Sequence, residues 1–167
     1  GVLPADKLDL PVDFDTLTEA GSMMGSGGLV VMDDTTCMIQ IAKYFVDFLK
    51  DESCGKCTPC REGLVAFGSI LNRIINGDGQ ENDIELLEEY GQNMCETSLC
   101  ALGQTAANPV LSTIKYFRDE YEDHIRNGNC IALKCKALIE YSINAENCTG
   151  CTICARNCPV DAIRGNL

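Results

Sequence analysis

CGKCTPC, at residues 54–60, is the first of two runs of closely spaced cysteines in this chain. It spaces three cysteines two residues apart, so that each step between them is one tight turn, and Pro59 suits the first turn of a following helix. Successive C-x2-C steps favour an iron–sulfur cubane, whereas a single zinc ion on the same thiolates is the competing interpretation. The candidate ligands, with a fourth cysteine from a later loop, are Cys54, Cys57, Cys60 and Cys100.

A second cysteine run, CTGCTICARNCP at residues 148–159, has the C-x2-C-x2-C-x3-C-P spacing of bacterial ferredoxins. In two-cluster ferredoxins the fourth cysteine of such a run ligates the other cluster. We therefore expect one 4Fe–4S cluster on the first three cysteines and a contact to a second cluster from the fourth. Either the cysteine run that would hold this second cluster lies beyond Leu167, or the site is incomplete. The predicted ligands are Cys148, Cys151, Cys154 and Cys158.

Four of the twelve cysteines remain, together with the single histidine. His124, Cys130 and Cys135 form a nitrogen-and-sulfur set that suits zinc, and either Cys37 or Cys95 would complete a tetrahedron. The alternative is that the histidine is an ordinary core or surface residue and the cysteines are buried apolar side chains. With its one histidine among cysteines, the chain offers no hydrolase triad.

Composition narrows the class of protein. Disulfide scaffolds are also rich in cysteine, but the cysteines of this chain are grouped in C-x-x-C steps, and no signal peptide opens the chain. Metal thiolates imply a reducing, cytoplasmic setting. The net charge of −12 argues against nucleic acid, and no apolar stretch is long enough to span a membrane. Both ends, at Gly1 and Leu167, look like cuts through larger units.

Apolar periodicity predicts a mainly α fold. Helices are expected over residues 35–50, 59–75 and 83–94, and from Asn108 onward. Phe48 is placed on the buried face of the first of these helices. Short connections between four helices favour a small bundle. Alternating apolar residues in 1–34 predict small strands there, and residues 130–167 have the short turns and helix of a ferredoxin-like half.

Three segments together resemble a known family: SGGLVVM at 26–32, ESCGKCTPCREG at 52–63 and SLC at 98–100. They look like the NADH-binding flavoprotein subunit of respiratory complex I and its soluble relatives, over roughly residues 1–125. The resemblance implies that residues 1–34 end a β-grasp-like ligand-binding domain. It also implies that residues 35–125 form a helical bundle whose 4Fe–4S cluster takes electrons from FMN. The ligands it implies are Cys54, Cys57, Cys60 and Cys100.

The remainder is more similar to the diaphorase subunit of NAD(P)-dependent, electron-bifurcating FeFe-hydrogenases. This similarity rests on QTAANPVLST at 104–113, CKALI at 135–139 and the ferredoxin run. It implies a zinc hinge at 126–147 and a truncated, ferredoxin-like (α+β) segment at 148–167. The flavin- and nicotinamide-binding region, with FMN and NAD(P), would precede Gly1. The zinc site that it implies supports His124, Cys130 and Cys135 as ligands, and we choose Cys37 over Cys95 as the fourth.

The resulting hypothesis is an iron–sulfur electron relay within the diaphorase subunit of a soluble hydrogenase. Its expected partners are a hydrogenase-type catalytic subunit, a small 2Fe–2S thioredoxin-like subunit and soluble ferredoxin. Subunits of NAD-dependent formate dehydrogenases share the layout and remain an alternative, as does a complex I-like enzyme. A protein of a different class is also compatible with the cysteines: a structural adaptor domain whose metal ions only stabilise its fold.

Overall fold

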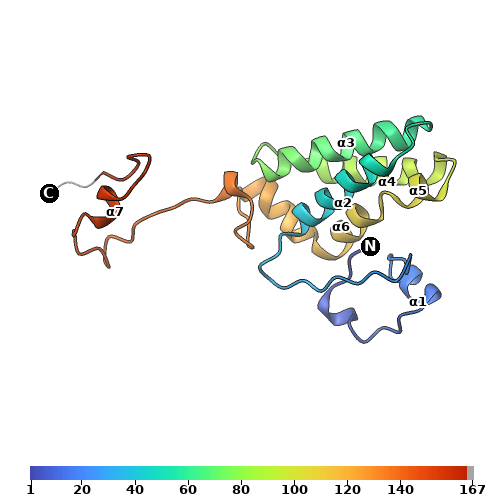
Figure 1. Cartoon of the computed structure of the whole chain (residues 1–167), viewed down its shortest axis with the longest axis horizontal. Coiled ribbons are helices and arrows are strands. Elements are labelled where there is room, and N and C mark those ends of the chain that lie inside the picture. Colours follow the sequence, from blue (N-terminus) through green and yellow to red (C-terminus); the bar gives the residue numbers. More distant parts are fainter. Residues whose placement is uncertain (165–167) are drawn as a thin grey trace.

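Four long helices form the body of the molecule in the computed structural model, which describes residues 1–164 (Figure 1). They are α2 (Met38–Glu52), α3 (Thr58–Ile75), α4 (Asp83–Thr97) and α6 (Asn108–Glu122). The helices lie where the sequence pattern predicts them, so the mainly α fold is confirmed. A short helix that the pattern did not reveal, α5 (Ala101–Thr105), joins α4 to α6.

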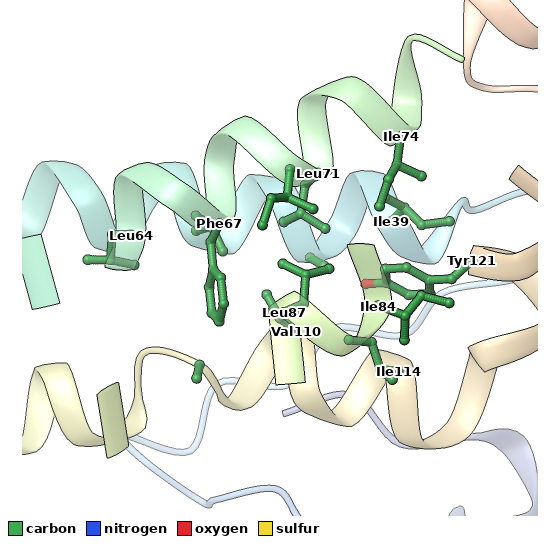
Figure 2. Close-up of a cluster of buried hydrophobic side chains, with 14 of the residues drawn as sticks. Ile39, Leu64, Phe67, Leu71, Ile74, Ile84, Leu87, Val110, Ile114 and Tyr121 are labelled. Atoms are coloured by element: carbon green, nitrogen blue, oxygen red, sulfur yellow. The ribbon is translucent and has the colours of Figure 1, made fainter. Parts of the chain in front are cut away.

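The core of the bundle lies between these helices. α3 packs against α2 and α4, and α6 packs against both of these neighbours. Leu64, Phe67 and Leu71 of α3 are fully buried and, with Leu87 of α4 and Val110 of α6, belong to one apolar cluster (Figure 2). Each such side chain contributes about 1.5–3 kcal/mol when it leaves water. Apolar packing is therefore what positions the loops at the helix ends.

The buried face of α2 differs in part from the prediction. Ile39, Ala42 and Val46 are fully buried and lie three and four residues apart, as one face of a helix requires. Phe48 is 54% exposed, so its predicted place on that face is wrong. An apolar residue two positions after Val46 lies on a different side of the helix.

The strands predicted for residues 1–34 are wrong, because no strand occurs among residues 1–164. This segment instead contains a 3₁₀ turn, η1 (Ala5–Lys7), and α1 (Phe14–Glu19). Asp13 caps α1 by accepting a hydrogen bond from the Thr16 N–H at 2.7 Å. A strand needs a neighbour to pair its backbone groups, and the apolar run at 29–31 is exposed without one in the described chain. The β-grasp-like interpretation thus has no strand to support it.

The N-terminal segment is nevertheless attached to α6. The Val2 N–H donates to Ser112 Oγ at 2.8 Å, and the Tyr116 hydroxyl donates to the Ala20 carbonyl at 2.5 Å. Val2 itself is buried. These contacts place residues 1–22 beside the bundle without a sheet.

The C-terminal part begins where α6 continues directly into a π-helical turn, η2 (Asp123–Asn127). A 3₁₀ turn, η3 (Lys136–Leu138), and a short helix, α7 (Ile153–Arg156), follow as the chain leads away from the bundle (Figure 1). The strand part of the predicted ferredoxin-like (α+β) segment at 148–167 is wrong for residues 148–164. None of residues 141–164 is buried, so these residues build no core for a strand to cover. Residues 165–167 lie outside the described residues.

Across residues 1–164, no helix has both the length and the apolar content needed to cross a membrane.

An ion pair with a buried carboxylate connects α3 with α4. The guanidinium of Arg73 donates to both carboxylate oxygens of Asp83, with Nε 2.8 Å from Oδ2, and the Gln80 N–H donates to Oδ2 at 2.9 Å. The Asp83 side chain is fully buried. Its hydrogen bonds raise the pKa of Arg73.

We expect Asp83→Ala to lower the free energy of unfolding by about 2–3 kcal/mol, because it removes charge-assisted hydrogen bonds at the start of α4. Urea denaturation measures the change. Glu89→Ala, at an exposed position of the same helix, is the matched control and is expected to change stability by less than about 0.5 kcal/mol. Equal losses in the two variants would contradict the role given to the ion pair.

Candidate metal centres

The first cysteine group lines one cavity of about 130 Å³ at the end of the bundle. Cys54 lies in the loop after α2, Cys57 is the N-cap of α3, Cys60 lies in its first turn, and Cys100 is the N-cap of α5. The structure thus brings together thiols from two segments that are far apart in the sequence. The other residues lining the cavity are Glu52, Ser53, Ser98, Leu102 and Gly103.

The loop that presents these thiols is held in shape locally. Gly55 has φ +70°, a left-handed conformation that favours glycine. The Arg61 guanidinium donates to the Gly55 carbonyl at 2.6 Å, and the Gly55 N–H donates to Ser53 Oγ at 3.3 Å. Arg61 therefore makes a structural contact in this loop.

Close packing brings Cys100 to the cavity. A Cβ atom on Gly103 would lie 2.6 Å from both Cβ and Oγ of Ser98 and 3.1 Å from Cβ of Cys60. Only a residue without a side chain lets α5 approach α3 and the end of α4 this closely. Gly103 thereby fixes the distance between the Cys100 segment and the other three thiols.

The electrostatics of the cavity suit an anionic group. α3 is 18 residues long and begins at the cavity, with Pro59 in its first turn. The N-terminal end of such a helix carries partial positive charge and unpaired N–H groups. Four thiolates with a helix N-terminus beside them form a donor set that fits an iron–sulfur cubane.

The second cysteine group is buried at the start of α2, at the opposite end of this helix from the first cavity. The candidate ligand atoms of Cys37, His124, Cys130 and Cys135 all lie within 4.8 Å of one another, and all four residues are buried. Cys37 is the N-cap of α2, and His124 belongs to the π-helical turn η2. Cys95, the other candidate for the fourth position, is exposed and lies outside this set.

The distances within this second group match a tetrahedron around one ion. Ligands at about 2.3 Å (Zn–S) and about 2.0–2.1 Å (Zn–N) are separated by about 3.8 Å for two sulfurs and about 3.6 Å for sulfur and nitrogen. Cys37 Sγ lies 3.7 Å from Cys135 Sγ, and His124 Nε2 lies 3.5 Å and 3.4 Å from these two sulfurs. These three ligands therefore have the spacing that a single tetrahedral ion requires, and Cys130 Sγ lies within 4.8 Å of each of them.

Neighbouring groups orient the ligands. Nδ1 of His124 lies 2.7 Å from the carbonyl oxygen of Glu120, and a proton on Nδ1 leaves Nε2 to face the sulfurs. The Gln40 side-chain amide and the Lys134 N–H donate to the sulfurs of Cys135 and Cys130 at 3.5 Å and 3.4 Å. Such contacts are typical of the groups that surround metal ligands.

The ionisable side chains of this second group shift the pKa values of one another. The hydrogen bond with Cys135 lowers the pKa of Cys37 to about 4, and the same contact raises the pKa of Cys135. Burial by itself lowers the pKa of His124, but its hydrogen bond with Cys37 and the thiolate charge raise it to about 9. A cation bound here would favour the thiolate form of the cysteines and the neutral imidazole, so its binding would release protons.

The ferredoxin-type cysteines are arranged differently. Cys148, Cys151 and Cys154 are exposed and Cys158 is half-buried. Gly150 and Thr152 have φ of 69° and 61°, which makes the tight turns between successive cysteines. Within residues 1–164, only the set of Cys37, His124, Cys130 and Cys135 has three or more ligand atoms that all lie within 4.8 Å of one another. The ferredoxin-type cysteines do not form such a set.

Some residues at the sites escaped the sequence-based prediction. Ser53 and Ser98 each stand one or two positions before a cysteine, and Gly103 follows Cys100 by three. Their adjacency to the cysteines was a usable signal. By contrast, the backbone carbonyl of Glu120 carries no sequence signal beyond its position one helical turn before His124.

Comparison with known proteins identifies the family. The family described as "NADH-ubiquinone oxidoreductase-F iron-sulfur binding region" matches residues 40–124, and the "4Fe-4S binding domain" family matches residues 141–164. The chain is 47% identical over 165 residues to the NADP-reducing hydrogenase subunit HndC of Solidesulfovibrio fructosivorans, covering 99% of this chain and 34% of that protein. It is 46% identical over 129 residues to an NADH-quinone oxidoreductase chain of Rhizobium meliloti (strain 1021), the F 2 subunit, covering 77% and 31%.

The solved structures agree with these relatives. The crystal structure of an NAD+-reducing [NiFe]-hydrogenase in the air-oxidized state matches with a TM-score of 0.66 and 31% identity, covering 74% of this chain and 21% of that one. The chain spans about a third of the length of the curated relatives it matches. On the match over residues 40–124, this chain belongs to the family of the NADH-ubiquinone oxidoreductase-F iron–sulfur binding region.

Proposed function

We propose that this chain is the iron–sulfur electron-relay part of the diaphorase subunit of a soluble, multisubunit NAD(P)-dependent hydrogenase. The observation that carries the proposal is the convergence of Cys54, Cys57, Cys60 and Cys100 on one cavity beside the N-terminus of α3. A cluster bound there supplies a one-electron redox centre. The likeness to the NADP-reducing hydrogenase subunit over 99% of the chain favours a hydrogenase over a formate dehydrogenase or complex I-like enzyme.

In this proposal the residues around the cavity have separate tasks. The four cysteines hold the cluster, and Gly103 permits the approach of Cys100. Leu102, which packs against the apolar core, limits the access of water. The N-terminus of α3 stabilises the added negative charge on reduction. FMN and NAD(P) would bind outside this chain, and a small 2Fe–2S thioredoxin-like subunit and the hydrogenase-type subunit would exchange electrons with it.

We further propose that Cys37, His124, Cys130 and Cys135 hold a zinc ion. The spacings of sulfur and nitrogen in the structure fit tetrahedral zinc, and four protein ligands leave no open position for catalysis. The ion would connect the start of α2, the end of α6 and the segment at 130–135. It would thus fix the point from which the ferredoxin-type segment leaves the bundle.

The ferredoxin-type segment is proposed as a second path for electrons. Cys148, Cys151 and Cys154 would hold one 4Fe–4S cluster, while Cys158 would contact another. The match of residues 141–164 to the 4Fe–4S binding domain supports this assignment. Because all four cysteines lie near the surface, a soluble ferredoxin is the partner expected to exchange electrons there, as electron bifurcation requires. We expect the whole enzyme to be cytoplasmic, where thiols stay reduced.

Cys57→Ser tests the relay. We expect loss of the EPR signal of the first cluster, and a fall of at least about tenfold in electron transfer from NAD(P)H to the partner subunits of the complete enzyme, because a ligand is removed. Cys95→Ser, at an exposed cysteine outside the cavity, is the control and should retain both. An enzyme that transfers electrons at the normal rate after Cys57→Ser would refute the relay.

Cys135→Ser tests the zinc site. Zinc should fall from about one ion per chain to well below that, and we expect the loss of one ligand to destabilise the bundle by about 2 kcal/mol, or about 4–8 °C in melting temperature. Elemental analysis and thermal unfolding measure the two effects, with Cys95→Ser again as the control. Wild-type protein that is free of zinc when purified without chelators would contradict the assignment.

A further inference from the structure

Ser98 has a buried hydroxyl group without a partner. The residue is the C-cap of α4 and is only 4% exposed. Its N–H donates to the Met94 carbonyl at 3.2 Å, and its carbonyl accepts from the Gln104 side-chain amide at 3.0 Å. The Oγ atom is the one buried side-chain nitrogen or oxygen in residues 1–164 that finds no hydrogen-bond partner there.

Ser98 lies beside the cavity that the cysteines line. Ser98 is itself one of the lining residues, with Cys60 and Cys100 among the others. Gly103 packs so tightly against Ser98 that a Cβ atom there would come within 2.6 Å of Oγ. The Ser98 side chain therefore packs against Gly103, which leaves room for it, and this packing restrains it beside the cavity.

An unpaired buried hydroxyl is costly. A buried group without a hydrogen bond loses its bonds to water and gains none in exchange, and native structures contain few such groups. The cavity offers no oxygen or nitrogen acceptor to Oγ in the described chain, but it is lined by four sulfurs that become anionic on metal binding. Sulfur is therefore the acceptor that would satisfy the hydroxyl.

A second serine shows that a hydroxyl in this cavity can approach sulfur. Ser53 Oγ lies 3.4 Å from Cys60 Sγ while it accepts the Gly55 N–H at 3.3 Å. Its acceptor side is thus used by the backbone, and its proton is available to Cys60. Ser98 differs because nothing but the contents of the cavity is left to accept its proton.

We propose that the Ser98 hydroxyl donates a hydrogen bond to a sulfur of the cluster held by Cys54, Cys57, Cys60 and Cys100, and thereby raises the reduction potential of that cluster. The inference rests on the proposed function. Reduction adds one electron to the cluster, and no bond to Ser98 forms or breaks. Because the added electron increases the negative charge on sulfur, a donor hydrogen bond stabilises the reduced form more than the oxidised form. Ser98 is a tuning residue and not a catalytic one.

The test is an anaerobic titration of the holoenzyme with dithionite as reductant, followed by EPR of the first cluster. That signal is identified by its absence in Cys57→Ser. Ser98→Ala should make the reduction equilibrium constant roughly tenfold less favourable, which is about 59 mV for one electron, with iron and sulfide content unchanged. Ser98→Thr keeps the hydroxyl and should retain the wild-type potential to within about a third of that shift.

Thr97→Ala is the matched control, because it removes an exposed hydroxyl from the preceding residue, where it bonds to the Asn93 carbonyl. An unchanged potential in Ser98→Ala would overturn the inference. If Ser98→Ala lost the cluster, retention in Ser98→Thr would support the hydroxyl, and loss in both would show a packing role and overturn it. Wild-type enzyme without iron and sulfide would instead refute the proposed function itself.

Discussion

The close approach of α5 to α3 at Gly103 is the contact on which the cluster cavity depends. The apolar core of the bundle fixes α3 and α4, and α5 then enters the space that Gly103 leaves against Ser98 and Cys60. Cys100 reaches the cavity only because of this packing. A larger residue at 103 would separate the two cysteine segments, however well their own turns were formed. The core and the candidate redox site are therefore not independent parts of the molecule.

The second candidate centre uses the opposite end of α2 from the first, together with the end of α6. α2 supplies Cys37 at its start, and α6 supplies His124 through the π-helical turn that extends it. An extra residue in a helical turn is typical of functional positions, and here it belongs to the element that carries the only histidine. With an ion bound, the bundle would be held at one end by zinc and would present the redox cavity at the other. Under the proposed function, this division would separate a structural metal from an electron-carrying one.

Most of the helical fold could be predicted from the sequence, because buried residues recur at helical spacing in α2, α3 and α6. Phe48 was misplaced because a tertiary neighbour, not apolar character, decides which side of a helix is buried. The strands expected in residues 1–34 failed for the same reason: alternation describes a strand only where another strand is present to pair with it. The cysteine spacings pointed to the candidate ligands directly. The place of Ser98 two residues before Cys100 was visible in the sequence, but its importance could not be predicted, since that lies in a missing hydrogen bond that only the packed structure reveals.

The metal and sulfide content of the anaerobically purified protein, together with EPR of its reduced state, tests most directly whether this chain carries electrons. An electron relay with a zinc site predicts about four or more irons and as many acid-labile sulfides per chain, about one zinc, and an EPR signal that appears on reduction. Zinc alone, with no sulfide and no signal, would contradict it. The cysteines would then bind zinc only to stabilise a structural adaptor domain, and the electron-transfer function would have to be abandoned.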